Sequence, residues 1–389
     1  MSLIAYTLNY GKPAIIGDLL TTSEDEGSVL IPTIQGDARE AVKATNGVRS
    51  HEMRQKIYVL RPDMCIALAG NVYEMSLFLK EIKIYCSYSE AVSKTSIEKF
   101  LSIYDLDRNF QQSSFLILIN ERGETGDFKI NHLKYGEWVN KSTKLFEDSF
   151  VCGTGCNAFS EHMSKLDIQV GGSIVNDSLY HAIANNVRLL TRIMVNERIS
   201  LNTILNEWGA GFELIYLDKD SFLKLDNISY LITTGEINKS DVSFTPKRLM
   251  HYKYYGDFLC VYAFEINSYQ TEYINNTVVI TCKDYQVFPF IIKPVDGVNK
   301  MSRGVLPDLF FQTDKVAVGQ FIEVSNEQLI NSYFTKGDTT HMKYNHQEGI
   351  KIVLPAELYK SYSSTIRLTY TGILMNSKIN DEDSPARIR

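Results

Sequence analysis

Long uninterrupted apolar runs are missing from this sequence. A helix needs about 20 consecutive apolar residues to cross a bilayer, and no stretch of the chain reaches that length. The first residues also lack the order of a secretion signal, in which positive charge precedes an apolar segment. We therefore expect a cytoplasmic protein that does not associate with membranes.

Basic charge is also scarce. The chain has 40 Lys and Arg residues against 46 Asp and Glu residues, which gives a formal net charge of −6 at pH 7. Domains that bind nucleic acids usually carry a basic patch that matches the phosphate backbone. The acidic balance therefore disfavours nucleic acid as the main partner.

Cysteine and histidine clusters are sparse as well. Six cysteines among 389 residues do not resemble the dense disulfide framework of a small secreted domain. Cys152 and Cys156 have no matching second pair, and His341 and His346 are isolated from other ligand residues. A structural zinc site usually needs four such ligands. We expect neither a metal nor another cofactor.

The composition that remains is that of a globular protein, with 44% hydrophobic and 22% charged residues. Its first informative stretch is SLIAYTLNYGKPAIIGD, residues 2 to 18, where a turn at Asn9–Gly11 separates two largely apolar runs. This pattern predicts a β-hairpin. Removal of Met1 would leave Ser2 at the end of a fixed strand, with a hydroxyl and an α-amine on one residue. Such an amine can act as the base that activates the hydroxyl.

Residues 55 to 71, QKIYVLRPDMCIALAGN, predict a second hairpin. Lys56 stands at the start of its first strand, Arg61-Pro62-Asp63 forms the turn, and Gly70 ends an apolar return strand. Turn residues between two runs rich in β-branched and apolar side chains are typical of this motif.

A third motif is the Gly-x-Gly turn around Thr154, which follows an apolar run at 150–152. Taken in order, the three stretches resemble the start and core of the proteasome β-subunit and of its bacterial relative, the HslV-type peptidase. The spacing agrees with this family, because Asp18 follows Ser2 by 16 residues and Gly70 follows Lys56 by 14.

The resemblance implies catalytic roles for five residues. Ser2 would attack a peptide or amide carbonyl, and Lys56, held in place by Asp18, would favour deprotonation of the hydroxyl or the amine. The N–H of Gly70 would hold the oxyanion. The hydroxyl of Thr154 would support the nucleophile.

The resemblance also implies two contacts with substrate. Thr22 would bind a peptide through its main chain, and Leu68 would form the floor of the pocket for the side chain before the cut bond. A leucine there favours apolar or medium-sized side chains, although Leu68 is equally explained as a buried strand residue. The chain departs from the family at Asn206, where proteasome β-subunits carry an aspartate, and in a longer connection at 19–55.

Fold class follows from the residues and, more finely, from the resemblance. The predicted order of strands and helices indicates an α+β fold with sheet-on-sheet packing. Over about residues 2 to 230 the resemblance implies the four-layer αββα sandwich of the N-terminal-nucleophile hydrolases. We expect helices at 72–84, 89–104 and 177–197.

The domain organisation expected from these patterns has three parts. The hydrolase domain covers 1–235, a β-rich domain of unknown role covers 246–375, and a flexible tail covers 376–389. Strand patterns dominate the second part, including runs at 276–281, 287–292 and 364–374, and its best helical pattern is Asn326–Phe334.

Two functions from different classes remain open. The first is an N-terminal serine peptidase or amidohydrolase that acts on a peptide or protein. Since family members form rings that depend on an ATP-driven unfoldase, this function implies a homo-oligomer and such a partner. The second is a catalytically inactive proteasome-like fold that serves as an assembly or recognition scaffold with its C-terminal β domain. Serine in place of the usual threonine and the Asn206 departure favour the scaffold.

Overall fold

The computed structural model describes residues 2–23, 32–33, 36–37, 49–123, 127–169, 178–200, 202–238, 241–297, 310–324, 327–338 and 340–357. The expected tail at 376–389 and the expected strand at 364–374 lie outside these residues. The chain forms two compact units. The first comprises Met1–Ile228, His251–Ala263 and Phe288–Val305, and the second comprises Ser229–Met250, Phe264–Val287 and Leu306–Arg389.

The fold class expected from the sequence is wrong. The part of the chain that the structure describes is mostly β, with 55% of its residues in strands and 24% in helices, and its large sheets include a curled half-barrel. It is therefore not the α+β fold built on a four-layer αββα sandwich. One reason is strand length, because the separate strands expected at 276–281 and 287–292 form one continuous strand, β18, Thr277–Pro294. Hydrogen bonding to neighbouring strands can extend β structure through the polar residues between them.

Two antiparallel sheets build most of the first unit. Their strands are β1 Leu3–Asn9, β2 Lys12–Asp18, β7 Ile57–Arg61, β8 Met64–Gly70, β9 Ser113–Arg122, β10 Phe128–Tyr135, β11 Val139–Asn140, β12 Asp148–Gly153, β13 Phe212–Asp218 and β14 Ser221–Lys224. The six-stranded sheet has the order β11-β12-β1-β2-β13-β14, and the four-stranded sheet has the order β10-β9-β8-β7. Both hairpins expected from the sequence are confirmed, since β1 pairs with β2 and β7 pairs with β8.

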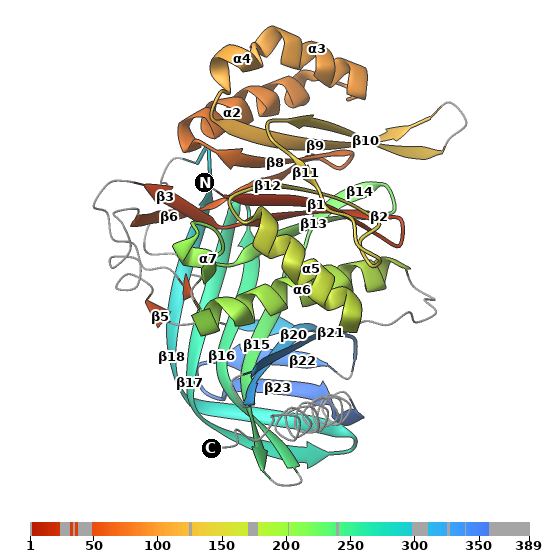
Figure 1. Ribbon diagram of the computed structural model, residues 1–389. Coiled ribbons are helices and arrows are strands. Elements are labelled where there is room, and N and C mark those ends of the chain that lie inside the picture. The colour runs from red at the N-terminus through yellow and green to blue at the C-terminus, as the bar shows by residue number, and fades with distance from the viewer. Residues whose placement is uncertain are drawn as a thin grey trace, which may run out of the picture. The chain divides into compact units, whose positions relative to one another are not determined.

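Helices pack beside each of these sheets (Figure 1). Beside the four-stranded sheet lie α2 Val72–Tyr88, α3 Lys94–Tyr104 and α4 Leu106–Asn109, and beside the six-stranded sheet lie α5 Cys156–Gln169, α6 Ser178–Ser200 and α7 Asn202–Leu205. The expected helix at 89–104 begins later, because Ser93 and Ser96 form a capping box that fixes the start of α3. Asn71 caps α2 by accepting the N–H groups of Tyr73 and Glu74.

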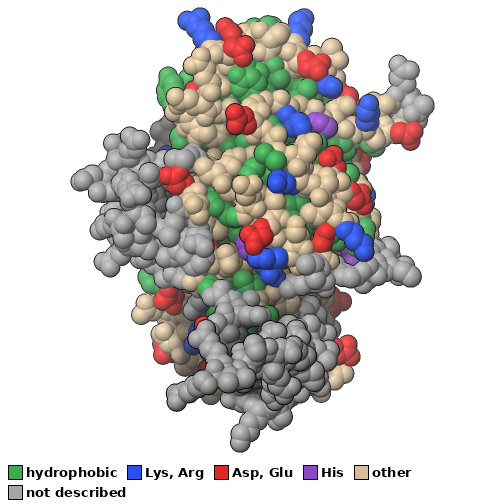
Figure 2. Space-filling view, in the orientation of Figure 1, with side chains coloured by type: hydrophobic (Ala, Val, Ile, Leu, Met, Phe, Trp, Pro, Cys, Tyr) green, Lys and Arg blue, Asp and Glu red, His purple; other side chains and the backbone are tan. Residues whose placement is uncertain are grey.

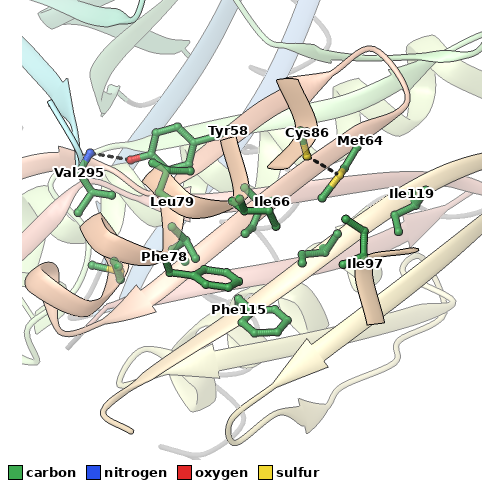
Figure 3. Close-up of a cluster of buried hydrophobic side chains, with 14 of the residues drawn as sticks. Tyr58, Met64, Ile66, Phe78, Leu79, Cys86, Ile97, Phe115, Ile119 and Val295 are labelled. Carbon is green, nitrogen blue, oxygen red and sulfur yellow. Dashed lines mark hydrogen bonds between the residues drawn. The ribbon is translucent and has the colours of Figure 1, made fainter. Parts of the chain in front are cut away.

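Apolar packing explains why β8 is hydrophobic on both faces. One face belongs to a cluster with α2 and β9, which includes Leu68, Phe78 and Phe115 and is drawn in part in Figure 3. The other face belongs to a cluster that combines residues of both sheets, including Ile4 of β1 and Ala67 of β8. A strand buried on both sides reads as a continuous apolar run.

A third sheet has eleven strands among the described residues. They are β3 Leu20–Ser23, β6 Arg49–Gln55, β15 Ile228–Asn238, β16 Asp241–Tyr255, β17 Phe258–Ile274, β18, β19 Phe311–Thr313, β20 Lys315–Val324, β21 Glu327–Lys336, β22 His341–Asn345 and β23 Gly349–Pro355. A further small pair joins β4 Pro32–Thr33 and β5 Gly36–Asp37.

The helix expected at 326–334 is wrong. The segment forms β21, which pairs with β20 along its whole length from Val324↔Glu327 to Lys315↔Lys336. A close hairpin partner supplies a complete hydrogen-bond ladder, and this tertiary pairing overrides a weak local preference for helix.

The described helices and the face shown in Figure 2 carry polar as well as apolar side chains. No helix among the described residues combines the length and apolar character needed to cross a bilayer. On the face shown in Figure 2, acidic and basic side chains are interspersed with apolar ones.

Candidate functional site

At the start of β1, Ser2 forms hydrogen bonds with Gly70 and with the backbone of Thr154, while the expected role of the Thr154 hydroxyl stays a prediction. The residue is only 1% exposed. Its hydroxyl oxygen accepts a hydrogen bond of 3.2 Å from the N–H of Gly70, and its carbonyl oxygen accepts one of 3.0 Å from the N–H of Thr154. The structure therefore brings together the first residues of one hairpin, the end of the second hairpin and the Gly-x-Gly turn.

The backbone at Gly70 explains why a glycine stands there. Its φ is +121°, a conformation that residues with a side chain rarely adopt. A Cβ at this position would lie 2.3 Å from the carbonyl oxygen of Gln112 and 2.5 Å from the Cα of Ser113. Glycine thus allows the end of β8 to pass close to the neighbouring strand while its N–H faces the Ser2 hydroxyl.

Asp18 and Lys56 form a fully buried ion pair close to Ser2. The Lys56 Nζ lies 2.6 Å from Asp18 Oδ1, and both side chains are 0% exposed. The same carboxylate oxygen accepts a hydrogen bond of 2.8 Å from the N–H of Leu3. Because one oxygen holds both the ammonium and the backbone next to Ser2, the pair is anchored beside the expected nucleophile.

Among the described residues, the Lys56 ammonium forms no hydrogen bond with Ser2. It donates to Asp18 and, over 2.5 Å, to the carbonyl oxygen of Leu20. An ammonium has three N–H donors. Within the described part of the chain, one N–H of Lys56 is thus left without a protein acceptor.

Burial sets the protonation behaviour of this pair. Desolvation raises the pKa of Asp18 and lowers the pKa of Lys56, while the charge and hydrogen bonds of each partner oppose these shifts. A lowered lysine pKa makes proton release easier than for a lysine in water. The pair therefore suits a site where a proton has to move.

Asp18 receives further support from the turn Gly209-Ala210-Gly211. The N–H of Gly209 donates to Asp18 Oδ2 over 2.9 Å, and the carbonyl of Gly209 accepts from the N–H groups of Leu19 and Leu20. All three turn residues have positive φ angles. The side chain of Asn206, the position that departs from the family, is exposed. The backbone of Gly209 thus fixes Asp18 from the side opposite Lys56 and Leu3.

Sequence reasoning missed two buried glutamates around this centre. Glu197 Oε2 accepts hydrogen bonds from Thr203 Oγ1 over 2.6 Å and from the N–H of Ala210 over 3.1 Å, so it holds the glycine turn. Glu213 Oε2 accepts from the N–H of Lys56 over 3.1 Å. Only Glu213 gave a signal, since it is an acid within the apolar run of β13.

The two expected substrate contacts have different outcomes. Thr22 lies in β3, opposite Ser50 of β6 at an irregularity in the ladder, and its side chain lies outside the described residues. Leu68 is fully buried in the apolar cluster beside α2. This position agrees with the alternative of a buried strand residue, and a role in a substrate pocket stays a prediction.

Metal ligands do not gather at this site or elsewhere among the described residues. No group of three or more His, Cys, Asp or Glu side chains is arranged to hold a metal ion there. The chemistry available at the site is that of a hydroxyl, a backbone N–H and a buried lysine–carboxylate pair. Together they fit acyl transfer to a serine.

Comparison with known proteins adds no family assignment. No protein-family model matches the chain, and a search of curated proteins finds no match. The resemblance to the proteasome β-subunit and the HslV-type peptidase stays a prediction from three short motifs.

Proposed function

We propose that this protein is an N-terminal serine hydrolase that cleaves peptide or amide bonds with Ser2 after removal of Met1. The observation that carries the proposal is the 3.2 Å hydrogen bond from the N–H of Gly70 to the Ser2 hydroxyl. A backbone donor and a nucleophile in direct contact suit the attack on a carbonyl, because the same N–H can then hold the developing oxyanion.

The reaction proceeds in two acyl-transfer steps. The Ser2 oxygen bonds to the carbonyl carbon, and its proton passes to the α-amine of the same residue. The protonated amine donates that proton to the leaving nitrogen as the C–N bond breaks, which leaves an ester on Ser2. Water then attacks the ester, the amine again takes and returns a proton, and the acid product leaves.

Lys56 assists through its charge. A cation close to the α-amine disfavours the ammonium form of that amine, which keeps the base free to accept the serine proton. Asp18 holds the lysine in place through its 2.6 Å contact. Loss of a donor such as the Gly70 N–H from an oxyanion site typically lowers kcat by about 10²–10³.

Covalent labelling tests this function. A peptide epoxyketone reacts with both the hydroxyl and the amine of an N-terminal residue, so it should label Ser2 in protein whose mass confirms loss of Met1. The Ser2→Ala variant should lose the label, and Ser87→Ala, which changes an exposed serine of α2, should keep it. Absence of labelling in protein that begins with Ser2 would count against the hydrolase.

The inactive scaffold is the second candidate, and the burial of Ser2 favours it. A Ser2 residue that is only 1% exposed is closed to a polymeric substrate in the form of the chain that retains Met1. Intact mass of the protein from its native host separates the two, because retained Met1 leaves no free Ser2 amine. The hydrolase implies, through its family resemblance, a cytoplasmic homo-oligomer with an unfoldase partner, which sedimentation and co-purification can test.

A further inference from the structure

A second candidate site lies in a cavity that none of the expected catalytic or substrate-binding residues lines. Its volume is about 320 Å³, and its walls come from β7, α2, β14 and the turn between β16 and β17. Small-molecule sites in proteins span roughly 300–1,000 Å³. The cavity is therefore large enough for a small ligand, and its chemistry can be inferred from the side chains that face it.

Tyr58 forms a fixed wall of this cavity. Its hydroxyl donates to the carbonyl oxygen of Gln55 and accepts a 2.8 Å hydrogen bond from the N–H of Val295, which is drawn in Figure 3. Two ammonium groups lie near its ring, with Lys83 Nζ 5.4 Å and Lys224 Nζ 5.5 Å from the ring centroid. A ring held at its hydroxyl gives the two cations a rigid surface between them.

Lys224 is the more buried of the two cations. Its side chain is 18% exposed, and its ammonium donates to Glu213 Oε1 over 2.8 Å and to Gln55 Oε1 over 2.7 Å. It also lies 4.5 Å from the ring centroid of Tyr254. Of its three N–H donors, one has no acceptor among the residues that the structure describes.

Lys83 reaches the same cavity from α2. Its side chain is 38% exposed, and its ammonium has one ion-pair partner within the described ranges, Asp296 Oδ2 at 2.8 Å. Two of its N–H donors are thus available to a ligand. The cavity therefore combines three donor positions on two cations of different depth.

The two acidic residues in the cavity lining, Asp226 and Asp257, differ from the lysines in what is available to a ligand. Asp226 Oδ1 is engaged by the backbone N–H groups of Asn227 and Tyr254, each at 2.7 Å. Asp257 is exposed in the turn that follows β16. Lys224 is thus buried more deeply than Asp257, and a ligand would meet a carboxylate at the rim and the Lys224 ammonium further in.

We propose that this cavity binds a small organic anion, a carboxylate or a phosphate monoester, whose acidic group accepts hydrogen bonds from Lys83 and Lys224. Charge-assisted hydrogen bonds of this kind are stronger than neutral ones. The exposed Asp257 selects a ligand whose opposite end carries a hydroxyl or an amine. The binding of this anion does not use Ser2.

Calorimetric titration tests the proposal on the full chain at pH 7 and constant ionic strength. Inorganic phosphate and succinate serve as separate probes, and at least one should bind one site with a Kd below about 1 mM. Lys83→Met should weaken binding about tenfold or more, because it removes hydrogen bonds from a charged donor. Lys80→Met, which changes an exposed lysine of the same helix, should alter affinity less than twofold.

The outcomes separate the ligand classes and the two proposals. Saturable binding of phosphate assigns the phosphate class, and saturable binding of succinate assigns the carboxylate class. Lys224→Arg keeps a cation opposite Glu213 and should preserve binding. Ser2→Ala should bind the probe as the unchanged chain does, whatever its labelling result. Absence of saturable heat with both probes, or equal weakening by Lys83→Met and Lys80→Met, overturns the site.

Discussion

The buried pair of Asp18 and Lys56 provides a stability prediction that can be worked from the structure. Asp18 accepts three hydrogen bonds, from Lys56 Nζ at 2.6 Å, from the N–H of Leu3 at 2.8 Å and from the N–H of Gly209 at 2.9 Å. Asp18→Asn removes the charge and leaves the ammonium unpaired at a position with no solvent exposure. Breaking such a pair by changing one partner costs about 3–5 kcal/mol of unfolding free energy.

The reciprocal change should cost less. In Lys56→Met, Asp18 keeps both of its backbone hydrogen bonds, whereas the ammonium left by Asp18→Asn keeps only the carbonyl oxygen of Leu20 among the described residues. We expect a loss of about 3 kcal/mol, at the lower end of the range for broken buried pairs. The double variant buries neither charge and should cost less than the sum of the single changes by at least about 2 kcal/mol.

Urea denaturation of the four proteins at pH 7 measures this cycle, with circular dichroism and tryptophan fluorescence as two probes of the same transition. Lys165→Met is the matched control. Lys165 Nζ also lies 2.5 Å from a carboxylate oxygen of Glu161, but both side chains are about half exposed or more. An exposed pair of this kind contributes roughly 0.3–0.5 kcal/mol, so the control should change stability little.

Two results would refute the reasoning. Additivity of the two single changes within about 0.5 kcal/mol would mean that the charges do not interact. Single changes no larger than that of Lys165→Met would mean that Asp18 and Lys56 are not buried together in solution.

Three further predictions concern other buried groups. Burial lowers the pKa of His162 from 6.5 to about 4, so between these pH values the unfolded chain binds a proton that the folded chain does not. Unfolding free energy should then fall as pH falls, by up to about 1.4 kcal/mol per pH unit. His162→Gln should therefore flatten the pH dependence of the unfolding free energy, measured by urea denaturation between pH 7 and 4. An unchanged slope in this variant would exclude His162 as the source of that dependence. Gly209→Ala should lower stability by more than about 2 kcal/mol, because its φ is +103° and a Cβ would lie 2.3 Å from Glu197 Oε2. Gly11→Ala, with φ +67° and no atom within 4 Å of the Cβ, should cost only about 1 kcal/mol. Equal melting temperatures for Gly209→Ala and Gly11→Ala would argue against the turn geometry at Gly209. Glu213→Gln should destabilise the chain by about 3 kcal/mol in the same assay, since it removes a carboxylate that pairs with a largely buried lysine, and wild-type stability would contradict that pairing.

Local sequence patterns were enough to predict the two hairpins that form the candidate site. In each hairpin the turn residues lie next to the strands they connect, so β1 with β2 and β7 with β8 can be read from a short window. The length of β18 and the strand character of β21 could not be read in this way. Both depend on hydrogen bonds to strands elsewhere in the sheet, which override local preference.

Part of the candidate site could also be predicted from the sequence, and part could not. The family resemblance named Asp18 and Lys56 as partners, and the structure places their charged atoms 2.6 Å apart. Glu197 and Glu213 were missed because their partners lie in other segments of the chain, and only the folded backbone brings the N–H of Lys56 to Glu213. Buried acids of this kind have no short sequence motif.

Glu213 divides its two oxygen atoms between separate tasks. Oε2 accepts the N–H of Lys56, and Oε1 holds Lys224 and the hydroxyl of Tyr254. Mutations on either side of this one carboxylate should therefore be epistatic, so the effect of a change at one lysine depends on which residue occupies the other. A library that randomises the cavity wall would need to keep an acid at position 213, or its variants would carry defects at Lys56 that have nothing to do with ligand choice.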